Sequence, residues 1–182
     1  MITRRNEMKL CNFSDENELI FNENKELYKK AIFFDLEHYV YRKPVCVGGV
    51  FGCCYYDSAK NSIEVTQYMI EGKKDIKKIL ELAKEYFENA YKIGEKKYIV
   101  TFSGNNDFTV INYLFEKYNI DFDIKEYFES IDLQREYEKE KKSSIGLKNL
   151  EKEFNITREE KELISGQNLA KTFSKIIKDE DI

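Results

Sequence analysis

Three acidic residues have the type and spacing expected of divalent-metal ligands. Asp35 and Glu37 lie two residues apart around the end of the apolar stretch 31–36, which suits a central strand covered on both sides. Side chains two residues apart in a strand project from the same face, so both carboxylates would stand together. Adjacent like charges need neutralisation, and hard cations such as Mg²⁺ prefer carboxylate oxygen. The alternative interpretation is that the strand ends at Leu36 and both acids face water.

Asp107 follows about 70 residues later, after an expected strand and a short polar turn, and it begins an expected helix. It is in register with the apolar stripe of that helix, so its carboxylate should point towards the sheet. The alternative is an acid that only stabilises the helix N-terminus through the helix dipole. Asn105 or Asn106 could cap the helix instead, which would leave Asp107 free for metal.

Together these acids suggest metal-dependent hydrolysis of a phosphodiester bond. Two divalent ions about 4 Å apart can activate a water molecule and stabilise the leaving oxygen. This chemistry requires several carboxylates and no nucleophilic side chain, which suits a chain with a single histidine. That residue, His38, is expected to face away from the two strand acids as a packing residue. A contact with substrate near the site is the other interpretation.

The chain must place these acids with a small set of elements. Apolar patterning predicts strands at 31–36, 46–56, 62–70, 97–102 and 130–133, and helices at 73–91, 107–118, 147–154 and 167–178. The second and third strands flank a turn at 57–61 and form a hairpin. This order indicates an α/β (mixed α+β) domain at 31–182, with a mixed central sheet, an antiparallel hairpin edge and helices on both faces. Residues 1–30 are interpreted as a polar, irregular N-terminal extension with a short helix at 24–30.

Composition narrows the class of protein. The chain has 30 basic and 34 acidic residues, a net charge of −4, which does not favour bulk capture of nucleic acid. No apolar run approaches the ~18 residues needed to span a bilayer, and no secretory signal is visible. We therefore expect a soluble cytoplasmic protein without a membrane partner. Its four cysteines are interpreted as reduced thiols, three of them in or beside one apolar strand.

Several motifs resemble those of the DEDD 3′–5′ exonucleases, which have a ribonuclease-H-like fold. IFFDLE resembles their first motif, a strand that ends in D-x-E, and VTFSGNNDFTVINYL resembles their second motif. The stretch from SIDLQ through SSIGLKNLEKEFNITREEKELISGQ resembles the C-terminal half of the YprB-type subgroup. The resemblance covers residues 31–178 and depends on the order and spacing of the motifs.

The resemblance implies a 3′–5′ exonuclease that acts on DNA or RNA ends, with Asp35, Glu37 and Asp107 as ligands of two Mg²⁺ or Mn²⁺ ions. Asp132 matches the "IDL" acid and is expected to support the site, as are Asn106 and His38. The family's fourth acid lies on a late helix, but here the only late acids are at 179–181. The chain is therefore either cut short of that helix or naturally lacks the ligand. The alternative functions are a degenerate module that binds nucleic acid or protein without cleavage, and a domain with no metal site.

Overall fold

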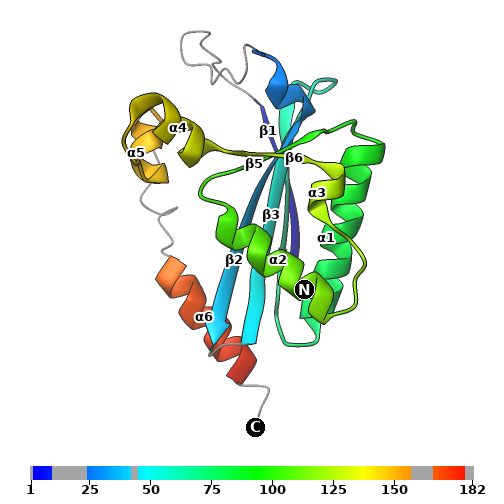
Figure 1. The fold of residues 1–182 in the computed structure, drawn as a ribbon. Coiled ribbons are helices and arrows are strands. Elements are labelled where there is room, and N and C mark those ends of the chain that lie inside the picture. The colour runs from blue at the N-terminus through cyan, green and yellow to red at the C-terminus, as the bar shows by residue number, and fades with distance from the viewer. Residues whose placement is uncertain (1, 10–23, 42–44, 157–165, 179–182) are drawn as a thin grey trace.

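A six-stranded mixed sheet organises the chain (Figure 1). The computed structural model describes residues 2–9, 24–41, 45–156 and 166–178. Its strands are β1 (Ile2–Lys9), β2 (Ala31–Tyr41), β3 (Val45–Asp57), β4 (Ser62–Met69), β5 (Tyr98–Thr101) and β6 (Glu129–Asp132). Its helices are the 3-10 helix η2 (Leu27–Lys30) and α1 (Asp75–Lys92), α2 (Asn105–Lys117), α3 (Ile124–Tyr127), α4 (Leu133–Lys141), α5 (Leu147–Glu153) and α6 (Gly166–Lys178).

The sheet is antiparallel in one half and parallel in the other. The strand order is β1-β4-β3-β2-β5-β6. The pairs β1–β4, β4–β3 and β3–β2 are antiparallel, and the pairs β2–β5 and β5–β6 are parallel. The expected hairpin is present as β3 and β4, and Asp57 holds its turn by accepting from the backbone N–H groups of Ala59 and Lys60. The mixed sheet inferred from the sequence is confirmed.

Several helices and strands differ from the sequence prediction. The N-terminal region is not wholly irregular, because β1 pairs along the whole of β4 and adds an edge strand. β2 does not end at Leu36 but continues to Tyr41. The short helices α3 and α4 were not predicted, since neither has an apolar stripe long enough to show helical periodicity. None of the described helices is long and apolar enough to cross a bilayer.

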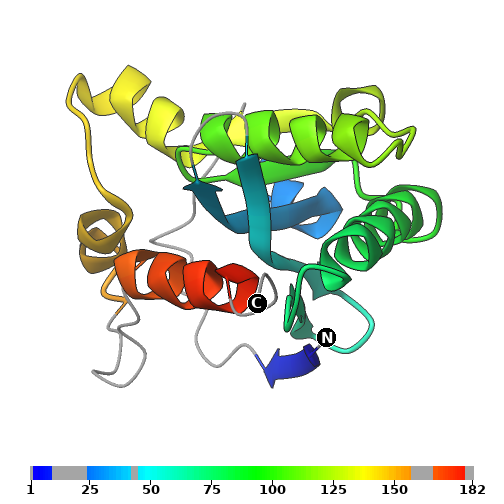
Figure 2. The ribbon, with the colours of Figure 1, turned by 90° about the horizontal axis from the view of Figure 1, so that it is seen from below.

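Helices cover both faces of β2 and β3 (Figure 2). α1 and α2 lie on one face, and the last helix, α6, lies on the other. Two adjacent glycines of β3 mark the two sides. A Cβ at Gly48 would meet Leu114 of α2 at 3.3 Å, whereas a Cβ at Gly49 would meet the ring of Phe173 of α6 at 2.3–2.5 Å. The chain therefore brings its C-terminal helix directly against the central strands.

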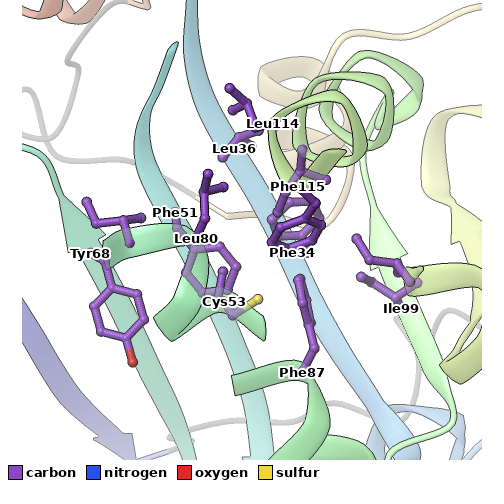
Figure 3. Close-up of a cluster of buried hydrophobic side chains, with 14 of the residues drawn as sticks. Phe34, Leu36, Phe51, Cys53, Tyr68, Leu80, Phe87, Ile99, Leu114 and Phe115 are labelled. Atoms are coloured by element: carbon purple, nitrogen blue, oxygen red, sulfur yellow. The ribbon is translucent and has the colours of Figure 1, made fainter. Parts of the chain in front are cut away.

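Aromatic residues fill the core under α1 and α2 (Figure 3). The Phe87 ring lies 5.6 Å from that of Phe34 and 5.5 Å from that of Phe51, centroid to centroid, with edge-on geometry in both pairs. These are favourable arrangements for aromatic pairs. The helical period correctly predicted the buried positions of α1, which are Ile76, Ile79, Leu80, Ala83, Phe87 and Ala90. Phe34 and Leu36 of β2 are buried in this core, so the side chains on the opposite face of β2 have a rigid support.

The close approach of α6 to Gly49 yields a packing prediction. We expect Gly49→Ala to destabilise the protein by about 1–3 kcal/mol, because an added methyl group overpacks the contact with Phe173. Gly48→Ala is the matched control, since its methyl group meets only the ends of flexible leucine side chains. Thermal unfolding and proteolysis of α6 are the measurements. A second change, Phe173→Leu, should restore part of the lost stability, and equal effects of the two glycine variants would contradict the packing.

Candidate metal-binding site

The two strand acids project from the middle of β2, on the face opposite the aromatic core. Asp35 is opposite Gly52 of β3 and Glu37 is opposite Val50. Phe34 and Leu36 alternate with them and are buried in the core, so both carboxylates point away from α1 and α2. Asp35 is exposed and Glu37 is half-buried. The acids therefore share a face, as expected, but they lie inside a strand rather than at its end.

Asp107 reaches the same strand from a different element. The pairing of β2 with β5 ends at Phe33 and Val100, so the edge of β2 beyond this point has no strand neighbour there. The first turn of α2 lies there and carries Asp107, whose side chain is only 13% exposed. The Leu36 backbone N–H donates a hydrogen bond to the Asp107 carboxylate. Asp107 thus points towards the sheet, as its register with the apolar stripe predicted.

The expected asparagine cap is absent. The N-cap of α2 is Gly104, which offers no side-chain hydrogen bond, and Asn105 and Asn106 are exposed in the first turn. The prediction that an asparagine would cap α2 was therefore wrong. A different carboxylate, that of Asp132, holds the turn before the helix: it accepts from the backbone N–H groups of Ser103 at 2.9 Å and Gly104 at 3.2 Å. Only the tertiary structure shows this contact.

The three carboxylates influence one another electrostatically. The pKa of Asp107 is raised to about 7, chiefly by burial and then by the charges of Asp35 and Glu37, while the Leu36 N–H acts in the opposite direction. Burial also raises the pKa of Glu37, and the charge of Asp35 adds to this effect. Desolvation by nearby protein atoms raises the pKa of Asp35, although its carboxylate remains open to solvent. The fold thus holds three acids together at a cost in electrostatic energy.

His38 lies beside the helix acid Asp107. It follows Glu37 in β2, so regular alternation turns its side chain to the face opposite Asp35 and Glu37. The His38 Nδ1 atom is 3.7 Å from Oδ1 of Asp107 and 3.2 Å from the Leu36 carbonyl oxygen. Its positive charge, when present, lowers the pKa values of Asp35 and Glu37. The contact with Asp107 joins β2 to the first turn of α2, which lie far apart in the chain, so the sequence could not reveal it.

The carboxylate oxygens of Asp35, Glu37 and Asp107 are suitable ligands for a hard divalent cation, but they do not converge on one position. Carboxylate oxygens are the preferred ligands of Mg²⁺ and Mn²⁺. Within the described ranges, however, no three His, Cys, Asp or Glu side chains converge closely enough to form a ready metal site. A complete site on Asp35, Glu37 and Asp107 therefore requires side-chain movement. Burial and the charges of Asp35 and Glu37 both disfavour the ionised form of Asp107, and a bound cation would offset these two effects.

The late helix supplies no further acid. α6 packs against β2, but its sequence, GQNLAKTFSKIIK, contains neither aspartate nor glutamate. The late acids Asp179, Glu180 and Asp181 lie outside the described residues. In the part of the chain that the structure describes, the site therefore consists of two strand acids, one helix acid and His38.

Comparison with known proteins identifies one family. The model of the RNase_H superfamily matches residues 32–182, which include all three acids and every element from β2 to α6. The curated proteins and the solved structures contain no match to the chain. Within the matched residues, the antiparallel strands β2, β3 and β4 lead into the parallel strands β5 and β6, which is consistent with this superfamily's fold.

The raised pKa of Asp107 predicts a stabilising substitution. The folded protein binds the Asp107 proton more tightly than the unfolded chain, whose pKa is near 3.8, so ionised Asp107 costs stability as pH rises from about 4 to about 7. Asp107→Asn should therefore stabilise the metal-free protein at pH 8 by roughly 2 kcal/mol, or about 5 °C in Tm. This gain should disappear near pH 4. Thermal melts across pH, with Asp123→Asn as an exposed control, test this, and a pH-independent gain would contradict it.

Proposed function

The chain belongs to the RNase_H superfamily, and on that premise we propose that it is a metal-dependent nuclease that hydrolyses phosphodiester bonds of DNA or RNA. Membership itself indicates a nuclease-type function related to nucleic acid, and nucleases of this kind typically use divalent metals. The more specific proposal is a 3′–5′ exonuclease with two Mg²⁺ or Mn²⁺ ions. The direction of cleavage derives from the resemblance of the sequence motifs to DEDD exonucleases.

One observation carries this proposal: a helix acid, Asp107, lies mostly buried near two strand acids, and burial together with the charges of Asp35 and Glu37 raises its pKa to about 7. Surface acids that only cap helices would not be held in this way. Asp123, for example, caps α3 and is exposed. Clusters of acids with shifted pKa values are typical of functional sites.

Each residue of the site has a distinct proposed role. Asp35, Glu37 and Asp107 would hold the divalent ions, which when bound supply water activation and neutralise charge on the phosphate. The Leu36 N–H, which donates a hydrogen bond to Asp107, would orient that carboxylate. The proposed role of His38, whose Nδ1 atom lies 3.7 Å from Oδ1 of Asp107, is to accept or donate a proton at that atom.

A second candidate function is a degenerate module that binds nucleic acid or a protein without cleaving. The observation that favours it is the absence of any acid from α6, the helix that packs against the strand of the acids. Three acids without a fourth would leave one ion with fewer protein ligands. The cleavage experiment decides between the two functions.

We expect the protein to shorten end-labelled DNA or RNA in the presence of Mn²⁺. Asp35→Asn should reduce the rate by roughly 100-fold or more, because metal stabilisation of a phosphoryl transition state is worth several kcal/mol. Glu85→Gln, an exposed acid of α1, is the matched control and should retain full activity. Substrates labelled at the 3′ or the 5′ end report polarity. Binding of nucleic acid without any cleavage would favour the degenerate module.

Metal binding should depend on pH through Asp107. A metal displaces the proton of a ligand, so affinity rises with pH up to the pKa of that ligand. For an Asp107 pKa of about 7, Mn²⁺ affinity should increase about tenfold per pH unit from 5 to 6.5 and level off above 7.5. Calorimetry measures this, and Asp107→Asn should bind weakly with a shallower pH dependence. A wild-type affinity that does not change between pH 5 and 7 would contradict the assignment of Asp107 as a ligand.

A further inference from the structure

The Asp132 carboxylate connects the two segments that follow the parallel strands β5 and β6. β5 and β6 end side by side, with Thr101 paired to Asp132. Oδ1 of Asp132 accepts hydrogen bonds from the backbone N–H groups of Ser103 at 2.9 Å and Gln134 at 3.1 Å, and Oδ2 accepts from Gly104 at 3.2 Å. This one side chain therefore caps α4 and also holds the turn that leads into α2.

The backbone of this turn is shaped to bind an anion. Ser103 has a left-handed φ of 56°, and Gly104 follows with a φ of −75°. When a residue with left-handed backbone conformation is followed by one with right-handed conformation, their N–H groups point into one concavity, which binds anionic oxygen. The turn has little freedom on its other side, because a Cβ at Gly104 would lie 2.3 Å from Oγ1 of the buried Thr101. The Asp132 carboxylate is thus the anion that this concavity holds.

The turn leads directly to Asp107. Gly104 is the N-cap of α2, and Asp107 lies in the first turn, three residues further along. No side chain caps this helix locally. The start of α2 is therefore held at two points, by Asp132 through the Ser103 and Gly104 N–H groups and by the hydrogen bond from Leu36 to Asp107. Release of the first contact would allow Asp107 to shift at the second.

We propose that Asp132 is a positioning residue, whose carboxylate fixes the turn between β5 and α2 and so places Asp107 beside Asp35 and Glu37. The proposal deepens the proposed function, on which it rests for the role of Asp107 as a metal ligand. Both Asp132 oxygens are engaged by backbone N–H donors. Asp132 therefore acts through the turn that carries α2 and Asp107.

The test compares two helix-capping aspartates. Asp132→Asn keeps one acceptor oxygen for the Gln134 and Ser103 N–H groups but replaces the other with an NH₂ group, which cannot accept from Gly104. Asp123→Asn is the matched control, because Asp123 caps α3 by accepting from the Lys125 N–H at 3.0 Å and is exposed. Any effect of weakened capping alone should appear in both variants.

The first readout needs no metal. In ¹⁵N-resolved NMR spectra, Asp132→Asn should shift the amide resonances of Ser103 and Gly104. It should also shift that of Leu36, whose N–H donates a hydrogen bond to Asp107. Exchange of the Leu36 amide with solvent should become about tenfold faster or more, since its partner is displaced. The control should leave Leu36 unchanged. If Ser103 and Gly104 respond to Asp132→Asn while Leu36 does not, Asp132 does not position Asp107 and the proposal is overturned.

The second readout is Mn²⁺ affinity measured by calorimetry. Loss of a residue that orients a ligand typically weakens metal binding 10–100-fold, and we expect this for Asp132→Asn but not for Asp123→Asn. Equal affinities in the two variants would also overturn the proposal. If the wild type binds no Mn²⁺, the proposed function fails, and the Leu36 amide alone then decides whether Asp132 places Asp107.

A fold-rescuing variant keeps the test usable if Asp132→Asn does not fold. Adding Ser103→Gly removes the conformational cost of the left-handed residue, because glycine adopts positive φ freely. The double variant is compared with Ser103→Gly alone. If the resonance and the exchange rate of the Leu36 amide are the same in these two proteins, the proposal is overturned.

Discussion

Electrostatic repulsion among three carboxylates at β2 is the constraint around which this structure is arranged. Asp35 and Glu37 project from one face of a central strand, and Asp107 is buried against the edge of that strand. Burial raises the pKa values of all three acids, and the charges of neighbouring acids raise those of Glu37 and Asp107 further. A fold selected for stability alone would separate them or pair each with a cation. Their assembly is the main physical reason for assigning this region a function.

The two halves of the sheet contribute to this assembly differently. The antiparallel half and α1 form a rigid aromatic core, which supports β2 from behind and fixes the direction of Asp35 and Glu37 (Figure 3). The parallel half brings in the third acid. β5 is only four residues long, so its end leaves room beside β2 for the first turn of α2. A longer β5 would occupy the edge of β2 where Asp107 now lies.

The C-terminal helix α6 lacks the acidic residue that an active nuclease of the proposed kind would be expected to carry there. α6 lies against β2 on the face of the strand acids, in contact with Gly49 through Phe173 (Figure 2). Its sequence carries lysines and no acid. The proposed nuclease must therefore hold its ions with three carboxylates from the described residues, whereas a binding module would need no additional ligand. The same packing serves both functions, so the fold does not discriminate between them.

The sequence alone determined the elements and the acids, and the tertiary structure decided their contacts. Apolar periodicity located β2, the β3–β4 hairpin, α1 and α2, because burial of one face leaves a regular pattern in the residue types. The spacing of Asp35 and Glu37 placed them on one face for the same local reason. Short elements such as α3 and α4 escaped prediction, since they are too short to show a period.

Long-range contacts were not accessible from residue types. Three contacts join segments that are distant in sequence: His38 with Asp107, β1 with β4, and Asp132 with the turn between β5 and α2. The sequence identified Asp107 as inward-pointing, but its proximity to Leu36 and its raised pKa arise only where β5 ends beside β2. Local patterns therefore name the acids, and the arrangement of the strands around them decides how their charges interact.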